Sequence, residues 1–141
     1  MVVNDNRIQY LRLHPLHGVL LAATIPLFLG GLLSDLAYAS SYQIQWSNFA
    51  SWLIVGGLVF GGAALLWAIA NLIFASRRSG YSLYPAILAA TWVLGFFNSL
   101  IHAKDAWAIM PMSLILSVIV VLLACVSTWI GFVKFGVGGR R

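Results

Sequence analysis

The sequence contains very little charge and almost no acid. Its 141 residues include three carboxylate side chains, Asp5, Asp35 and Asp105, and no Glu. Charged residues make up 8% of the chain, whereas about a quarter of the residues in a soluble domain are usually charged. This composition excludes an ordinary water-soluble domain, and it makes each remaining ionisable side chain a candidate for a specific role.

Cysteine and the common catalytic motifs are also scarce. The single cysteine, Cys125, cannot form an internal disulfide, so it gives no information about the redox compartment. It lies within the last apolar run, and free Cys is among the most buried residue types, so we expect a small buried hydrophobe. The chain has no G-x-S-x-G, Walker-type, C-x-x-C or H-E-x-x-H motif, which favours a protein that is not an enzyme.

Apolar sequence is what the chain has in abundance. Hydrophobic residues make up 62% of it, and the mean hydropathy is +0.96. Because a membrane-spanning helix needs about 20 apolar residues, we predict four transmembrane helices, near residues 14–39, 48–76, 82–103 and 106–134. The predicted fold class is all-α, an integral membrane four-helix up-down bundle that occupies residues 1–141 as a single domain.

The basic residues predict the orientation of this bundle. Of the eight Lys and Arg residues, only Lys104 lies in a connection on one side of the membrane. The other seven lie on the opposite side, at Arg7, Arg12, Arg77, Arg78, Lys134, Arg140 and Arg141. The positive-inside rule then places both termini in the cytoplasm. Cations at the ends of helices indicate topology and contact with the lipid bilayer, and not nucleic-acid binding.

Aromatic side chains are expected to mark both membrane interfaces, because rings with a polar group favour headgroup depth. The predicted outer set is Tyr38, Tyr42, Trp46, Trp52 and Trp107. The predicted inner set is Tyr10, Tyr81, Tyr84 and Trp129.

Three of the predicted helices carry a seam of small and polar residues at alternating spacings of four and three, which places each seam on one helical face. The first seam is His17, Leu21, Thr24, Phe28, Gly31 and Asp35. The second is Tyr84, Leu88, Thr91, Gly95, Asn98 and His102. The third is Ser113, Ser117, Val120, Ala124, Ser127 and Gly131. Since polar groups within a membrane usually face the bundle interior, we predict that all three seams point inward.

Antiparallel helices sort these polar residues into two layers, separated by roughly 15 Å of apolar packing at about 5.4 Å per turn. The inner layer is predicted to contain His14, His17, Asn71, Tyr84 and Ser127. The outer layer contains the candidate polar site, Asp35, Asn98 and His102, with Ser113 nearby. Asp35 and His102 could relay a proton or orient a metal-bound imidazole. We favour the alternative, an ion pair that reaches interfacial water and ties the first helix to the third. Asp105 is predicted to be the N-cap of the fourth helix.

His14 and His17 are the candidate ligands on the inner side. They lie three apart, so they could bind one metal, but no Cys, Asp or Glu lies at that depth to complete the site. The alternative is two interfacial imidazoles bonded to loop backbone. A single iron cannot reach both His102 and the inner histidines across about 30 Å of hydrocarbon. A haem b with two His ligands would therefore need a second subunit, and no cofactor is predicted for the chain alone.

Gly57 and Gly61 lie four apart in the second helix, where small residues allow two helix backbones to approach closely. This spacing predicts helix packing within the chain, with a homo-oligomer contact as the alternative. Pro26 and Pro111 are expected to bend the first and fourth helices.

Several short motifs resemble a bacterial family of four-helix inner-membrane proteins, domain of unknown function family 2231. Its members open with H-P-L-H-P and V-H-F-P, keep an Asp late in the first helix, and end with W-L-G-G and G-V-G-V. This chain has His14-Pro15-Leu16-His17, Asp35, and Trp129-Ile130-Gly131-Phe132 followed by Phe135-Gly136-Val137-Gly138. Asn98, His102 and Asp105 resemble an N-x-x-x-R-x-x-D region of the family.

The resemblance implies the same fold and topology, in a bacterial inner membrane. The departures concern histidine and proline positions, at Gly18, Ala22, Pro26, Tyr84 and Ala86. If relatives bind haem or metal through those histidines, this chain has lost ligands. Some relatives are fused to oxidoreductase domains or are found beside them, which suggests a membrane anchor or an electron-transfer partner.

Three functions follow as hypotheses. The first is a non-catalytic membrane protein that anchors or scaffolds a partner subunit. The second is a haem- or metal-binding electron-transfer subunit with a redox partner. The third is a small transporter or proton-conducting bundle, although four helices without internal repeats are few for a secondary transporter.

Overall fold

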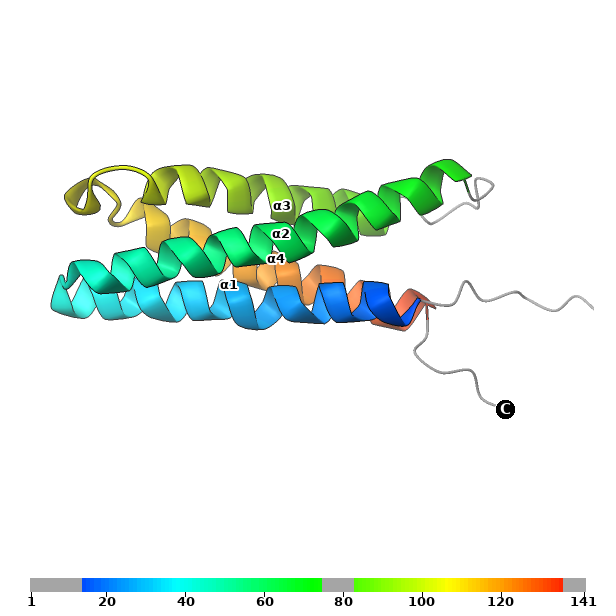
Figure 1. Ribbon diagram of the computed structural model, residues 1–141, viewed down its shortest axis with the longest axis horizontal. Coiled ribbons are helices and arrows are strands. Elements are labelled where there is room, and N and C mark those ends of the chain that lie inside the picture. The colour runs from blue at the N-terminus through cyan, green and yellow to red at the C-terminus, as the bar shows by residue number, and fades with distance from the viewer. Residues whose placement is uncertain (1–13, 75–82, 136–141) are drawn as a thin grey trace, which may run out of the picture.

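The computed structural model describes residues 14–74 and 83–135, with the side chains of residues 134 and 135 left out. These residues form four long helices and one short 3₁₀ helix (Figure 1). The long helices are α1 (Pro15–Ser41), α2 (Ile44–Phe74), α3 (Leu83–His102) and α4 (Met112–Phe135), and η1 (Ala106–Ala108) precedes α4. All four long helices are long and apolar enough to cross a membrane. The predicted all-α up-down bundle is confirmed.

The helices pack in a closed ring of neighbours. Helix α1 packs against α2 and α4, and α3 packs against the same two helices. One end of the bundle, which we call the Asp35 end, holds the C-terminal ends of α1 and α3 and the N-terminal ends of α2 and α4. The opposite end, the His17 end, holds the start of α1 and the end of α4 (Figure 1).

The turn between α1 and α2 is tighter than the sequence suggested. Tyr42 adopts a left-handed backbone with φ of 55°, and its N–H donates to the Tyr38 carbonyl at 2.8 Å. This cap ends α1 at Ser41, and α2 begins at Ile44, earlier than the predicted 48. Of the predicted connection, residues 40–41 belong to the end of α1 and residues 44–47 to the first turn of α2.

The start of the fourth helix was predicted too early, and two residue roles change with it. Asp105 precedes η1 and its side chain makes no capping hydrogen bond, so it is not the N-cap of α4. Pro111 lies immediately before α4 and therefore does not bend it. A proline has no N–H and suits the start of a helix better than its interior. Pro26 does lie inside α1.

The three predicted seams all face the bundle interior, since every seam residue of α1, α3 and α4 is buried. On α2, burial follows the same spacing through Gly57, Gly61, Ala64 and Ala68. Asn71 is exposed, however, because α2 buries nothing after Ala68, and its assignment to the inner layer is wrong. Cys125 is also exposed, contrary to prediction, because it lies one position beyond the buried Ala124 on α4.

Five of the predicted interface aromatics lie on the outside of the bundle. Tyr42, Trp52, Trp107 and Trp129 are each more than 60% exposed, and Trp46 is 37% exposed. Tyr38 and Tyr84 are buried instead, because each hydroxyl has a partner inside the bundle. Tyr10 and Tyr81 lie outside the described residues.

The glycines of α2 pack against side chains of the same chain. A Cβ at Gly57 would lie 2.6 Å from the ring of Phe28, whereas a Cβ at Gly61 would lie 3.6 Å from Thr24 Cγ2. The Phe28 ring also approaches Gly95 on α3, where a Cβ would lie 3.4 Å away. The buried Phe28 ring is therefore held between two glycines, and contacts within the chain account for the glycine spacing on α2.

This packing predicts different effects for two alanine substitutions. Gly57→Ala should lower the free energy of unfolding by about 1–3 kcal/mol, because the Phe28 ring has little room to move. Gly61→Ala is the matched control, with the same gain in helix propensity and only ordinary van der Waals contact. Denaturation of both variants in detergent micelles measures the difference. Equal stabilities would contradict the contact between Gly57 and Phe28.

Candidate functional site

Four buried polar side chains meet near the Asp35 end of the bundle. Asp35 lies late in α1, Asn98 and His102 lie in the last turns of α3, and Ser117 lies near the start of α4. Their exposed fractions are 0%, 1%, 8% and 2%, respectively. We refer to these four residues as the Asp35 network. Up-down topology brings them together, because α1 and α3 end where α4 begins.

Hydrogen bonds connect all four members. Asp35 Oδ1 lies 2.8 Å from His102 Nε2, and Asp35 Oδ2 accepts from the Ser117 hydroxyl at 2.5 Å. Ser117 Oγ in turn accepts from Asn98 Nδ2 at 2.8 Å. His102 Nδ1 lies 2.9 Å from the backbone carbonyl oxygen of Asn98. Both carboxylate oxygens and both imidazole nitrogens are therefore engaged within the chain.

The partners of His102 fix the number of protons in the network. A carbonyl oxygen can only accept, so His102 Nδ1 must carry a hydrogen. The contact between Nε2 and Asp35 Oδ1 then needs one further proton, which lies on the imidazole or on the carboxyl group. The first state is an imidazolium with a carboxylate, and the second is two neutral groups. The pair has no net charge in either state, which suits a buried site.

One atom of the network has no partner. The amide oxygen Asn98 Oδ1 is buried and accepts no hydrogen bond. Ser117 cannot supply one, because its single hydroxyl hydrogen points to Asp35 Oδ2. The hydrogen-bond pattern therefore assigns the amide nitrogen of Asn98 to the side that faces Ser117.

The segment before α4 covers this end of the bundle. The Tyr38 hydroxyl donates to the Ala106 carbonyl at 2.9 Å, and Ile109 is fully buried. Ser113, which was predicted near the site, is buried, but its hydroxyl faces Met110 Sδ at 3.4 Å. The Asp35–His102 pair therefore ties α1 to α3, and it is enclosed by the bundle where an interfacial pair was expected.

The two histidines near the start of α1 have separate partners. His14 is exposed and is the N-cap residue of α1, where its Nδ1 accepts from the Leu16 N–H at 3.3 Å. His17 is buried, and its Nε2 lies 2.7 Å from the Tyr84 hydroxyl. His17 Nδ1 is buried without a hydrogen-bond partner. Both rings contact Trp67, with centroid distances of 5.1 Å and 6.1 Å.

These contacts bear on the metal hypothesis. Each histidine uses one ring nitrogen within the chain, because His14 Nδ1 caps α1 and His17 Nε2 bonds across to Tyr84 on α3. Within residues 14–74 and 83–135, no three His, Cys, Asp or Glu side chains are grouped so that they could hold a metal ion.

An apolar layer separates the two polar ends of the bundle. It contains buried side chains from all four helices, with Leu21, Phe28, Ile54, Leu88 and Val120 among them. Three threonine hydroxyls occur at this depth. Thr24 bonds to Leu21 O at 2.7 Å and Thr91 to Ile87 O at 2.8 Å within their own helices, and Thr128 on α4 donates to Leu21 O on α1 at 3.5 Å. Among the hydrogen bonds of the described residues, none links the Asp35 network to His17.

Sequence reasoning found three of the four network members and missed the role of the fourth. Ser117 was placed on an inward seam but not at the site. Its signal was available in the topology, because Ser117 on α4 lies at the depth of Asp35 on α1. The unpartnered atoms of Asn98 and His17 had no signal in the sequence, because they depend on side-chain geometry.

Comparison with known proteins gives one family. The family described as "Predicted membrane protein (DUF2231)" matches residues 13–137. No curated protein matches the chain, and no solved structure matches it.

The network predicts that two substitutions of Asp35 lower the free energy of unfolding by different amounts. Asp35→Ala leaves His102 Nε2 and the Ser117 hydroxyl unpaired, so the free energy of unfolding should fall by about 3–5 kcal/mol. Asp35→Asn should cost only about 1 kcal/mol, because an amide can donate to a neutral imidazole and accept from Ser117. Unfolding in mixed micelles measures both changes.

The exposed Asp105 provides the control for this experiment, since Asp105→Ala should change stability by no more than about 0.5 kcal/mol. If Asp35→Asn were as destabilising as Asp35→Ala, the charge of the carboxylate would contribute more to stability than its hydrogen bonds do, which would contradict the graded response.

Proposed function

The chain belongs to the DUF2231 family of predicted membrane proteins, and we propose that it is a non-catalytic anchor or scaffold subunit of the bacterial inner membrane. One observation carries this proposal. The side chains best suited to chemistry, Asp35 and His102, already use their oxygens and nitrogens in bonds within the bundle. A substrate would find no free acid, base or ligand there, so the network acts as a tie between helices.

The outer face of α2 supports a scaffold role. Large apolar side chains repeat along it at a spacing of seven residues, at Trp52, Val59, Leu66 and Ile73, and each is at least 64% exposed. The small residues Ala63 and Ala70 lie between them and are also exposed. Alternation of large and small residues at heptad spacing suits the packing of another transmembrane helix. This face is the proposed contact with a partner subunit.

A photo-crosslinking residue at position 66 tests the partner contact. In intact membranes, we expect one discrete product of higher mass with the crosslinker at Leu66. The matched control places the same photo-crosslinking residue at position 122 on α4, where Leu122 is 60% exposed. This variant should give no such product. A product of twice the chain mass would identify a homo-oligomer, the other arrangement that this face allows. Only monomer at both positions would contradict the scaffold role.

We also propose that both termini are cytoplasmic. Seven of the eight Lys and Arg residues precede α1, follow α2 or lie from residue 134 onward, and Lys104 alone lies between α3 and α4. In a Cys125→Ser background, a cysteine at position 104 should react with a membrane-impermeant maleimide on intact cells. A cysteine at position 140 should react only after the cells are permeabilised. The reverse labelling pattern would place both termini outside the cytoplasm and would contradict this proposal.

A haem- or metal-binding electron-transfer subunit is the alternative, and one observation favours it. His17 Nδ1 is buried without a partner, as a nitrogen reserved for a ligand would be. The chain would then need a second subunit to supply further ligands. An absorption spectrum and metal analysis of the purified protein decide this point. A Soret band or a stoichiometric metal that His17→Ala removes would establish the alternative, and absence of both would exclude it for the purified chain.

A further inference from the structure

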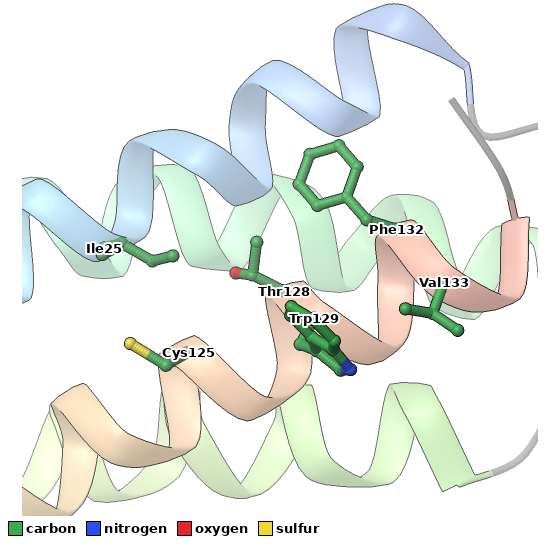
Figure 2. Close-up of a pocket in the computed structure, with 6 residues that line it drawn as sticks. All are labelled: Ile25, Cys125, Thr128, Trp129, Phe132 and Val133. Atoms are coloured by element: carbon green, nitrogen blue, oxygen red, sulfur yellow. The ribbon is translucent and has the colours of Figure 1, made fainter. Parts of the chain in front are cut away.

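A groove opens on the surface between α1 and α4. Its volume is about 480 Å³, and it is lined by Ile25, Cys125, Thr128, Trp129, Phe132 and Val133 (Figure 2). Ile25 comes from α1, and the other five residues come from α4. Figure 2 shows the side chains of Thr128 and Phe132 directed toward α1, between the two ribbons. The groove lies in the half of the bundle nearer to the His17 end, because α1 begins and α4 ends there.

The lining of the groove selects an apolar occupant. Its hydroxyl group, on Thr128, is 5% exposed and donates to the Leu21 carbonyl at 3.5 Å. Trp129 and Val133 are 72% and 65% exposed and form its open side. Since the helices belong to a membrane protein, this surface faces hydrocarbon. A flexible acyl chain can fill such a hollow without leaving a polar group unpaired.

The positions of the Lys and Arg residues in the sequence favour a lipid with an anionic headgroup. Seven of the eight Lys and Arg residues precede α1, follow α2 or lie from residue 134 onward, so in the sequence they adjoin the helix ends that form the His17 end, whereas Lys104 follows α3. Anionic phospholipids concentrate beside such basic segments. Trp129 has the amphipathic ring that favours headgroup depth, and it stands at the open side of the groove. An apolar lining and cations in the adjoining sequence together match one ligand.

We propose that the groove between α1 and α4 is a lipid-binding site that holds one acyl chain of an anionic phospholipid, with its headgroup toward the His17 end. The site does not depend on the scaffold role, because it lies on α1 and α4 and the proposed partner face lies on α2.

Fluorescence quenching by brominated lipids tests this site. The protein is reconstituted into phosphatidylcholine vesicles that contain a small fraction of brominated phosphatidylglycerol or of brominated phosphatidylcholine. The signal of Trp129 is the difference between the unmodified protein and Trp129→Phe. The matched control is Trp52, which is 77% exposed near the Asp35 end and is measured through Trp52→Phe. Both substitutions replace exposed rings, so the fold should be retained.

At equal mole fractions, the brominated anionic lipid should quench Trp129 several-fold more than the brominated neutral lipid does. Trp52 should be quenched equally by both lipids. Cys125→Phe fills the groove from an exposed position and should abolish the preference at Trp129 only. Equal quenching of Trp129 by both lipids would overturn the proposal, and so would a preference that survives Cys125→Phe. Failure of both brominated lipids to quench Trp129 would also overturn the proposal, because it would show that no acyl chain occupies the groove.

Discussion

The hydrocarbon of a bilayer offers no hydrogen bonds, and this constraint governs the interior of the protein. A polar side chain in a transmembrane helix must find its partners inside the bundle, or it destabilises the fold. The four members of the Asp35 network bond to one another, and only Asn98 Oδ1 among their buried polar atoms has no partner. Near the other end His17 bonds to Tyr84 through Nε2, and its Nδ1 has no partner. Hydroxyls that lack a cross-helix partner, such as those of Thr24 and Thr91, bond to carbonyls of their own helix.

The same constraint explains how the chain tolerates an acid in its interior. An isolated carboxylate would be very costly in this environment, and so would an isolated imidazolium. Asp35 and His102 avoid both costs because they share a single proton between them. Hydrogen bonds from Ser117 to Asp35 and between His102 and the Asn98 carbonyl then fix the orientation of the two groups. The contact joins diagonally opposite helices, α1 and α3, which otherwise pack mainly through α2 and α4.

Those features of the fold that depend on periodicity could be predicted from the sequence. The four helices and the inward seams follow from apolar runs and from the spacing of small and polar residues, and the buried positions of α1, α3 and α4 agree with them. The meeting of Asp35, Asn98 and His102 followed from topology alone.

Periodicity does not show where a helix ends. The left-handed cap at Tyr42 and the η1 turn before Met112 are local backbone choices, and the predicted boundaries there were wrong. Asn71 lies beyond Ala68, after which α2 buries no residue, and Cys125 lies one position beyond the buried face of α4.

The apolar layer between the two ends limits what the polar residues can do together. Phe28 fills the space beside Gly57 and Gly95, so the centre of the bundle is closed by an aromatic ring that has glycine on either side. The threonine hydroxyls at this depth bond to backbone carbonyls: Thr24 and Thr91 to their own helices, and Thr128 to Leu21 on α1. Apolar packing therefore separates the two polar ends. Near one end, an acid and a base neutralise each other and join two helices. Near the other, His17 keeps one nitrogen unpaired beside an aromatic cluster. Within the described residues, Asp35 and His102 form the one acid–base pair of the interior, and they hold the C-terminal parts of α1 and α3 together.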